Sequence, residues 1–295
     1  MLLALAGALT LAACGEPARD WPEPSPALWE VSGEHGEKAW LFGTIHALPD
    51  GAEWRTPAFE RAFAASDLLM VEIGDLDDSR AAARAFEQFA KTPGLPALSA
   101  RAPLEDRPAV GALMVRAGMD DADFWDVETW AAALILANAV RESETGNGVD
   151  RDLLDLARPE RLAVPASRRG KPVEALETFS AQFARFDRLS EAEQRRFLAA
   201  VARDSGREDT DAQAEAWLTG DLAALASRVE RELNAQPALR QALVTDRNDY
   251  FAARIAATIE EGREPFVAVG AGHMLGPDGL PALLAERGYA VRRVQ

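Results

Sequence analysis

The sequence predicts an α/β fold in which a central, mostly parallel sheet carries a functional site at the carboxyl ends of its strands. Three observations lead to this prediction. Apolar runs of strand length lie near both ends of the chain, at residues 38–42, 68–73 and 266–269. A helical pattern separates the first two runs, as in a βαβ unit. A long stretch of helical pattern, at about 79–264, then stands between the early and late strands, so we expect an α+β arrangement with a large helical insert.

The composition is typical of a well-folded globular protein. The 295 residues are 48% hydrophobic, which is enough for a sizeable core. The formal net charge of −16 is spread along the chain, and no basic block could neutralise a phosphate backbone. We therefore expect no nucleic-acid partner, and we interpret the acidity as solubility charge on helix surfaces.

The first 14 residues are typical of an export signal. They form an apolar run that ends at Cys14, the single cysteine, and the run is shorter than the ~20 residues that a transmembrane helix needs. Its ending, Leu11-Ala12-Ala13-Cys14, resembles the bacterial lipobox, which implies a lipid anchor on Cys14, although no Lys or Arg precedes the run. Because Gly15 stands where Asp would favour the inner membrane, the resemblance implies a periplasm-facing protein of the outer membrane. The alternative is an ordinary buried N-terminal helix with a chance cysteine.

The next segments predict a tether and the first elements of one domain over residues 28–295. Residues 15–27 are rich in proline and polar residues, a composition that cannot bury enough surface to fold. A hairpin follows, with strands at 28–32 and 38–42 and with His35 at its exposed tip. Thr56 and Pro57 fit the N-cap and first position of a helix. The apolar run 68–73 then predicts a strand parallel to the second strand of the hairpin.

The remainder of the chain is predicted to be helical and then to return to the sheet. The apolar segment 130–140 predicts a buried helix, because it is too short to cross a membrane. Residues 190–193 fit a capping box that opens a helix to about residue 204, and a short extended piece at 171–176 could add a strand. Apolar spacing predicts one long helix that ends at Gly262, followed by a strand at 266–269, a helix at 280–287 and a last strand at 289–294.

Two of the three histidines occupy the same motif, in which an apolar strand ends at a glycine and His follows three residues later. The motifs run from Gly43 to His46 and from Gly270 to His273. Ligands bind beyond the carboxyl ends of parallel strands, and glycines there allow a close backbone approach, so these glycines and Gly272 are predicted to line the site. Two neutral imidazoles at one edge would suit a divalent cation. The alternative is that each histidine only hydrogen-bonds a loop.

Glu72 is the expected third partner of the two histidines. It is the only charge in the run 68–73, where an ionised carboxylate is costly unless it is paired or binds a cation. Two histidines and one carboxylate can hold a metal and leave positions open for water or substrate. The alternative for Glu72 is a salt bridge with a loop arginine. Asp50 and Asp75 rank lower, because loop aspartates commonly form turns.

Several short motifs, in this order and spacing, resemble the TraB/GumN family over about residues 28–294. They are Trp40-Leu41-Phe42-Gly43-Thr44-Ile45-His46, Val71-Glu72, Gly148-Val149-Asp150, Gly170-Lys171-Pro172-Val173 with Leu176-Glu177-Thr178, Asp246-Arg247-Asn248 and Val269-Gly270-Ala271-Gly272-His273-Met274. The family includes the animal Tiki proteins, which are membrane-tethered metalloproteases that require manganese or cobalt, and its fold is related to ChaN-like haem-binding lipoproteins and to erythromycin-esterase-like proteins. The resemblance implies that His46, Glu72 and His273 are metal or catalytic positions, and that Arg247 and Asn248 are family-like positions.

These observations together predict a divalent-metal-dependent hydrolase that acts on a peptide or protein, with manganese, cobalt or zinc at His46, His273 and Glu72. Glu72 could instead be the general base. Arg247 could hold a substrate carboxylate, or it could pair with an acidic neighbour. The chain has neither a His-Glu-x-x-His helix nor a Gly-x-Ser-x-Gly elbow. Two rival hypotheses stay open: a non-enzymatic lipoprotein that binds haem or another ligand, and a scaffold that acts through protein contacts.

Overall fold

A computed structural model describes residues 19–46, 48–49, 51–74, 76, 78–142, 148–158, 170–204, 210–226 and 236–295. Cys14, the first part of the predicted tether, Asp50 and Asp75 lie outside these residues. The predictions for these residues therefore rest on the sequence alone.

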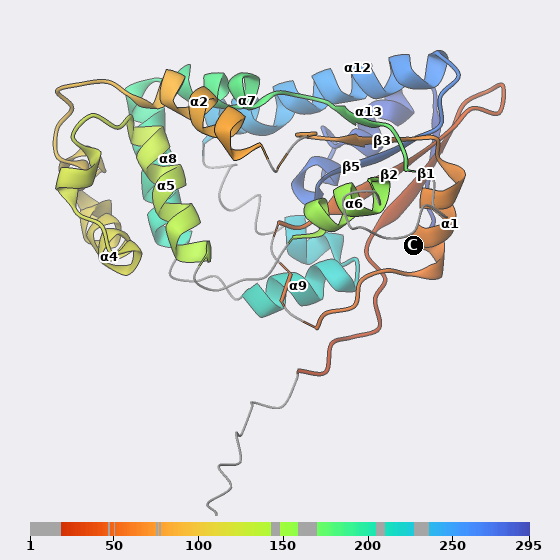
Figure 1. Ribbon diagram of the computed structural model, residues 1–295, viewed down its shortest axis with the longest axis horizontal. Coiled ribbons are helices and arrows are strands. Elements are labelled where there is room, and N and C mark those ends of the chain that lie inside the picture. The colour runs from red at the N-terminus through yellow and green to blue at the C-terminus, as the bar shows by residue number, and fades with distance from the viewer. Residues whose placement is uncertain are drawn as a thin grey trace, which may run out of the picture.

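Six strands in the described residues form one sheet, in the order β4-β3-β5-β2-β1-β6 (Figure 1). The strands are β1 (Leu28–Ser32), β2 (Lys38–Thr44), β3 (Leu68–Val71), β4 (Val173–Ala175), β5 (Pro265–Gly270) and β6 (Ala290–Arg293). The four strands β4, β3, β5 and β2 run parallel, whereas β1 is antiparallel to both of its neighbours. The predicted α/β class is confirmed, as are the N-terminal hairpin and the short strand before residue 176.

The late strand β5 lies between two early strands, β2 and β3. Those two are joined directly by α1 (Pro57–Ala65), which begins as predicted: Thr56 accepts a hydrogen bond from the backbone of Phe59, and Pro57 is the first helical residue. β5 pairs with β2 as far as Gly270, opposite Thr44, and with β3 as far as Ala268, opposite Val71. The carboxyl ends of all three strands therefore meet at one edge of the sheet.

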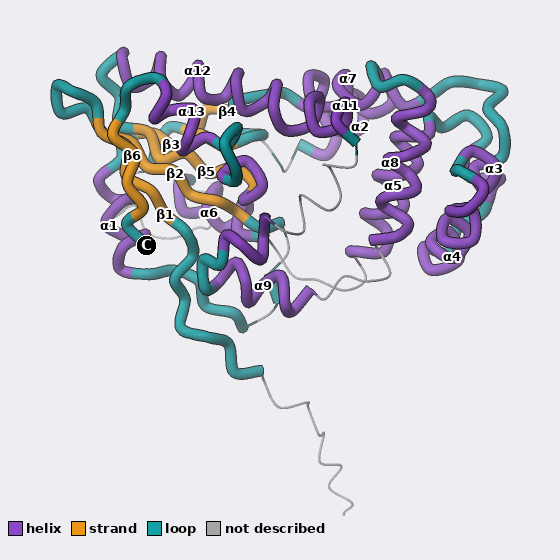
Figure 2. The backbone as a smooth tube through the Cα atoms, turned by 180° about the vertical axis from the view of Figure 1, so that it is seen from behind, coloured by secondary structure: helices purple, strands orange, loops and turns teal. Residues whose placement is uncertain are grey.

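Helices cover both faces of the sheet and give three layers (Figure 2). On one face, α12 (Asp246–Glu260) and α13 (Leu280–Glu286) contribute Phe251, Ile255 and Leu284 to a buried apolar cluster. On the other face, α1, α6 (Val149–Ala157) and α9 (Thr210–Leu218) pack around Phe42. The Phe42 ring contacts four other rings, at centroid distances of 5.4 to 6.0 Å, which belong to Trp54, Phe59, Trp217 and Phe266.

The remaining helices form a cluster beside the sheet with an apolar core of its own. They are α2 (Ser79–Ala90), α3 (Leu98–Arg101), α4 (Arg107–Ala117), α5 (Thr129–Glu142), α7 (Phe179–Asp187) and α8 (Glu191–Asp204), with 3₁₀ turns at Leu104–Asp106 and Asp121–Phe124. The predicted buried helix is confirmed as α5, and α8 opens with the predicted capping box of Ser190 and Glu193. No helix in the described ranges has the length and apolarity to cross a membrane.

The predicted helical stretch at 79–264 is interrupted, because α6, β4, α9 and α12 return to the sheet. The predicted single helix before Gly262 is also wrong in one place. It consists of α11 (Pro237–Arg240), a π-helical turn (Gln241–Thr245) and then α12. Apolar spacing could not predict the π turn. The wider turn rotates the buried face of the helix, but apolar residues still recur at similar intervals in the sequence. Such turns are frequent at functional sites.

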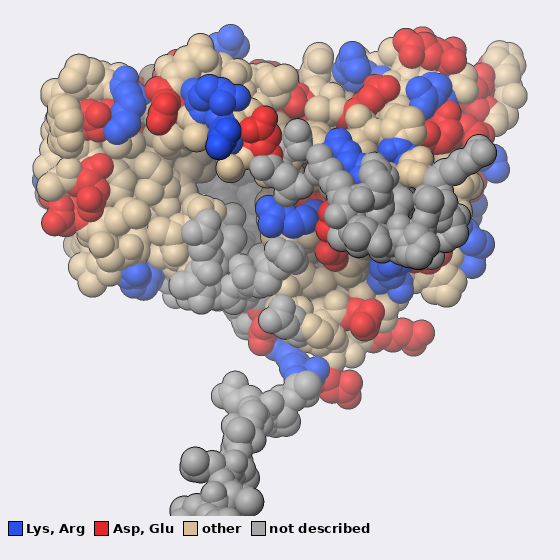
Figure 3. Space-filling view, viewed as in Figure 1, with Lys and Arg blue, Asp and Glu red and all other residues tan. Residues whose placement is uncertain are grey.

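One face of the molecule, shown in Figure 3, is hollowed between the cluster of α4, α5 and α8 and the sheet. Acidic and basic side chains are intermixed over this face, and they do not gather into a block of one sign. The charge of the chain is thus dispersed on this face, as the sequence pattern indicated.

Arg101 is a buried cation that holds together the loops of the helical cluster. Its side chain is fully enclosed, and its nitrogens donate hydrogen bonds to three backbone carbonyl oxygens, of Pro96 at 2.7 Å, Phe124 at 2.6 Å and Val127 at 2.5 Å. These carbonyl groups lie in the connections before α3 and before α5. The carbonyl of Phe124 also accepts a 3.2 Å hydrogen bond from the backbone N–H of Val127. A buried carbonyl without a donor is costly, and Arg101 is the donor to the carbonyl groups of Pro96 and Val127.

We expect Arg101→Met to lower the free energy of unfolding by roughly 2–4 kcal/mol, because it leaves these carbonyl groups buried without a donor. Urea unfolding followed by circular dichroism measures the change. Arg107→Met is the matched control: Arg107 is exposed and donates to Ala100 and Ala102 of the same region, and we expect its loss to cost under about 1 kcal/mol. Equal losses in the two variants would contradict the proposed role of Arg101.

Candidate metal centre

The three predicted site residues surround one glycine at the edge where β2, β5 and β3 end. A Cβ atom added to Gly270 would lie 3.2 Å from Glu72 Oε1, 3.9 Å from His273 Cδ2 and 4.0 Å from His46 Nε2. Glu72 directly follows β3, His46 lies two residues beyond β2, and His273 lies three residues beyond β5. The structure therefore brings together the residues that the two motifs and the buried carboxylate indicated.

His46 is oriented by Asp150, which lies in the first turn of α6. His46 Nδ1 is 2.7 Å from Asp150 Oδ2. An ionised carboxylate can only accept a hydrogen bond, so Nδ1 carries the proton and Nε2 is the acceptor nitrogen of the ring. The side chain of His46 is 66% exposed, so surrounding packing constrains it little, and the contact with Asp150 fixes the direction of Nδ1.

Gly148 permits this contact between α6 and the His46 loop. A Cβ atom at Gly148 would lie only 2.2 Å from the carbonyl oxygen of His46, a separation that no side chain could tolerate. The next residue, Val149, donates its backbone N–H to the carbonyl of Ile45 at 3.0 Å. The start of α6 is thus packed directly on the loop, and Asp150 follows within reach of the imidazole.

His273 is oriented in the same way from the opposite face of the sheet. It is buried in the 3₁₀ turn Ala271–Met274, which also contains Gly272, and its Nδ1 is 2.5 Å from Asn248 Oδ1. The amide nitrogen of Asn248 donates to the carbonyl of Asp278 at 2.7 Å, so its oxygen must be the atom that faces the ring. Nδ1 of His273 therefore carries the proton, and Nε2 is the acceptor.

Both histidines thus have the same tautomer, with Nδ1 bound to an oxygen and Nε2 at the site. This arrangement is typical of metal-binding histidines, whose second ring nitrogen almost always donates to a carboxylate or another oxygen. The sequence patterns predicted this role for neither Asp150 nor Asn248. Asp150 lies 104 residues from His46, and no local spacing could pair the two.

Glu72 is bound on both of its oxygens. Oε1 accepts a hydrogen bond of 2.7 Å from the backbone N–H of Gly270, and Oε2 contacts Arg247 of α12. Burial alone would raise the pKa of Glu72, but the charges of His273 and Arg247, with the Gly270 N–H, outweigh it and lower this pKa to about 2. Burial also lowers the pKa of His273 to about 4, so the ring is neutral at pH 7 and Arg247 is the cation that keeps Glu72 ionised there.

Arg247 also contacts Glu177, which follows β4 and is buried. Arg247 thus pairs with acidic neighbours, but these follow β3 and β4 and do not lie in the helical layer, and the arginine that pairs with Glu72 lies on α12 and not in a loop. Burial raises the pKa of Glu177. Within the described part of the chain, no three His, Cys, Asp or Glu side chains converge closely enough to form a metal centre as they stand. The three candidate ligands surround Gly270 without meeting at one point.

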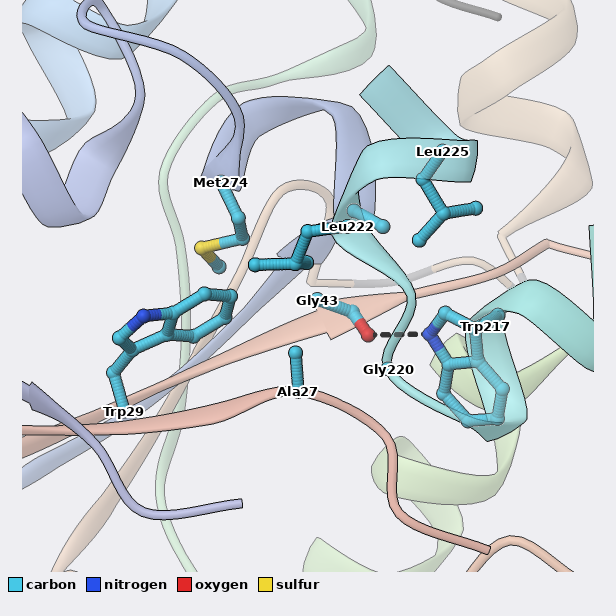
Figure 4. A pocket seen from close by; sticks show the side chains of 9 residues that line it. Ala27, Trp29, Gly43, Trp217, Gly220, Leu222, Leu225 and Met274 are labelled. Atoms are coloured by element: carbon cyan, nitrogen blue, oxygen red, sulfur yellow. Dashed lines mark hydrogen bonds between the residues drawn. The ribbon is translucent and has the colours of Figure 1, made fainter. Parts of the chain in front are cut away.

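A small apolar pocket of about 10 Å³ borders both Gly-x-x-His loops (Figure 4). Gly43, Ala271 and Met274 of the two loops line it together with side chains from the opposite wall, which include Trp29, Trp217, Leu222 and Leu225. Trp217 donates a 2.7 Å hydrogen bond from Nε1 to the carbonyl of Gly43. A Cβ atom at Gly43 would lie 3.0 Å from Ala271 Cα, so the glycine lets the second loop pack on β2.

One known protein family matches nearly the whole described fold. The TraB/PrgY/gumN family matches residues 27–293, from the residue before β1 to the last residue of β6. The matched span contains both Gly-x-x-His motifs, and also Glu72, Asp150 and Arg247. Comparisons with curated proteins and with solved structures found no similar one.

The buried imidazole of His273 predicts a stability that falls in acid. Its pKa is about 4 in the folded protein, against 6.5 for an unperturbed histidine, so below pH 6.5 the unfolded chain binds more protons. The contribution is complete above pH 6.5 and is lost as the pH falls towards 4, by on the order of 2–3 kcal/mol. We expect His273→Gln to flatten this part of the curve of unfolding free energy against pH, measured with a chelator present.

His35→Gln is the matched control for this measurement, because His35 lies at the exposed tip of the hairpin, away from the site. A wild-type curve that parallels that of His273→Gln between pH 6.5 and 4 would show that His273 does not contribute the loss.

Proposed function

The chain belongs to the TraB/PrgY/gumN family, and we propose that it is a divalent-metal-dependent hydrolase that acts on a peptide or protein. One observation carries the proposal: His46 Nε2, Glu72 Oε1 and the His273 ring lie around the same glycine, and His273 Nε2 is 3.6 Å from Glu72 Oε1. Both rings are held through Nδ1 by Asp150 and Asn248, so their acceptor nitrogens are already oriented.

The donor set fits a cation. His273 Nε2 and Glu72 Oε1 are 3.6 Å apart, and at neutral pH neither carries a proton that the other could accept. Two acceptor atoms at this distance repel each other, and a cation bound by both would remove the repulsion. Two imidazoles and one carboxylate suit manganese, cobalt and zinc alike, so the residues support the class of metal more strongly than one member of it.

His46, His273 and Glu72 would hold the ion, and a bound ion of this kind polarises a carbonyl group and lowers the pKa of a water molecule. Asp150 and Asn248 orient the two rings. A pKa of about 2 makes Glu72 a weak proton acceptor at neutral pH, which favours a ligand role over that of general base.

The rival hypothesis of haem binding receives less support from this geometry. His273 is buried, and its Nε2 lies 3.6 Å from a carboxylate oxygen, where a planar macrocycle would have to fit. The pocket beside the loops, of about 10 Å³, is also far below the range of roughly 300–1,000 Å³ that is usual for ligand pockets. No specific contact favours the scaffold hypothesis.

We expect the purified chain to retain close to one equivalent of manganese, cobalt or zinc after dialysis against that metal, and His46→Ala and His273→Ala to lose most of it. Elemental analysis measures the content, and cleavage of a broad peptide library with each metal tests the reaction. His35→Ala, at the hairpin tip, is the control and should behave as the wild type. Full stoichiometric metal in both site variants would refute the proposed site, and a haem absorption band lost in them would favour the rival.

We also propose that the site faces the periplasm on an outer-membrane lipid anchor, with the lipobox-like sequence before Cys14 as the support. Expressed from its own start, the chain should incorporate labelled palmitate and sediment with outer membranes. Cys14→Ser should abolish both labelling and sedimentation, because a single thiol is available for acylation. A wild-type chain that stays unlabelled and soluble would contradict the anchor without bearing on the metal site.

A further inference from the structure

A second carboxylate, Glu177, lies behind Glu72 and shares its arginine. Strand pairing places it there: beyond β3 and β4 the ladder continues, and Glu177 N donates to the carbonyl of Glu72 at 3.0 Å. Nη2 of Arg247 contacts Oε2 of Glu72 and Oε1 of Glu177 together. One nitrogen of the guanidinium therefore serves two carboxylates, while Nη1 is held by the carbonyl of Leu243 in the π turn at 3.2 Å.

The hydrogen bonding of this cluster is incomplete. Among the described residues, Arg247 Nε is buried without an acceptor, and Glu177 Oε2 is buried without a hydrogen-bond donor. The side chain of Glu177 is only 1% exposed, so water cannot compensate. A second arginine, Arg185, has its Nε 3.6 Å from Oε2, which is too long for a hydrogen bond, and this Nε is likewise buried without an acceptor. An unpaired donor and an unpaired acceptor thus belong to the two partners of one ion pair.

A two-nitrogen contact between Arg247 and Glu177 would pair both of these atoms. Guanidinium and carboxylate groups form such bidentate contacts readily. Were the guanidinium to turn onto Glu177 in this way and leave Glu72, Glu72 would keep its bond to the Gly270 N–H. Glu72 would then offer a full negative charge to the space around Gly270. The cluster therefore has two ways to neutralise Arg247, and only one of them leaves Glu72 available to a cation.

We propose that Glu177 is a positioning residue that receives Arg247 when Glu72 binds the metal ion, so that the Arg247–Glu72 pair and the bound ion exclude each other. This inference rests on the proposed metal site. A guanidinium on Oε2 of Glu72 weakens the attraction of the same carboxylate for a dication at Oε1, because the two cations repel and share one charge. Without Glu177, Arg247 has no other buried carboxylate among the described residues to pair with and stays on Glu72.

The test measures binding of Mn²⁺ alone to the purified full chain, with the free ion followed by electron paramagnetic resonance. We expect Glu177→Gln to raise the Kd for Mn²⁺ by about tenfold or more, as is usual when a residue that supports a metal ligand is changed. We expect this effect to fall below about twofold when Glu177→Gln is made in an Arg247→Gln background, because the competitor is then gone. A merely structural role of Glu177 would give the same loss in both backgrounds.

The exposed pair of Glu174 and Arg254 provides a matched control. Glu174 lies in β4, three residues before Glu177, and Arg254 lies in α12 with Arg247; their side chains are 44% and 46% exposed. Glu174→Gln removes the same charge from a neighbouring position and should leave the Kd unchanged. Should the wild type fail to bind Mn²⁺, the proposed metal site and the inference both fall. Should the wild type bind and Glu177→Gln match Glu174→Gln, the inference alone is overturned.

A measurement on the wild type tests the proposal even if the variants do not fold. In a ¹⁵N spectrum of arginine side chains, addition of Zn²⁺ should slow the exchange of the Arg247 Nε–H with solvent, because this group gains Glu177 as its acceptor. The corresponding signal of Arg254 should not change. Identical exchange of the Arg247 Nε–H before and after saturation with Zn²⁺ would overturn the proposal.

Discussion

The parallel pairing of β5 between β2 and β3 is the constraint on which the candidate site depends. Parallel strands that start at the same edge also end at the same edge, and His46, Glu72 and His273 each follow one of these three strands. Apolar burial holds the register. Phe42 and Phe266 face one helical layer, and a shift of one residue would turn them to the other face. Residues from the first quarter of the chain and from its end thus meet at Gly270.

Each of the two helical layers orients one histidine ring. Asp150 reaches His46 from α6, which covers one face of the sheet, and Asn248 reaches His273 from α12, which covers the other. The hydrogen bonds are short and leave each ring with Nε2 as its acceptor. Packing of both layers against the sheet is therefore also the means by which the chain orients its two imidazoles. A substitution in either layer should therefore disturb the orientation of a histidine ring before it disturbs the sheet.

The charge balance beneath the site depends on Arg247. Two buried carboxylates would repel each other and would be costly to keep ionised, but Arg247 contacts both and offsets much of this cost. The π turn before α12 is part of the same arrangement, because the carbonyl of Leu243 holds the guanidinium. The same arginine opposes a second cation at Glu72. In the proposed metal-bound form, stability of the resting cluster would compete with affinity for the ion, and Glu177 is placed where it could relieve that competition.

The sequence by itself determined the α/β class, most of the strands, and the three residues around Gly270. These features are encoded locally: strand and helix periodicity, a glycine where a strand ends, and a lone charge in an apolar run are visible within a few residues. Only the tertiary structure decided that β5 lies between β2 and β3, that Asp150 and Asn248 orient the histidines, and that Glu177 shares Arg247 with Glu72. These pairings join segments far apart in the chain, as in the bond from Gly270 to Glu72, which spans 198 residues. They depend on how the layers pack together, a property of the whole fold that no short window of residues contains.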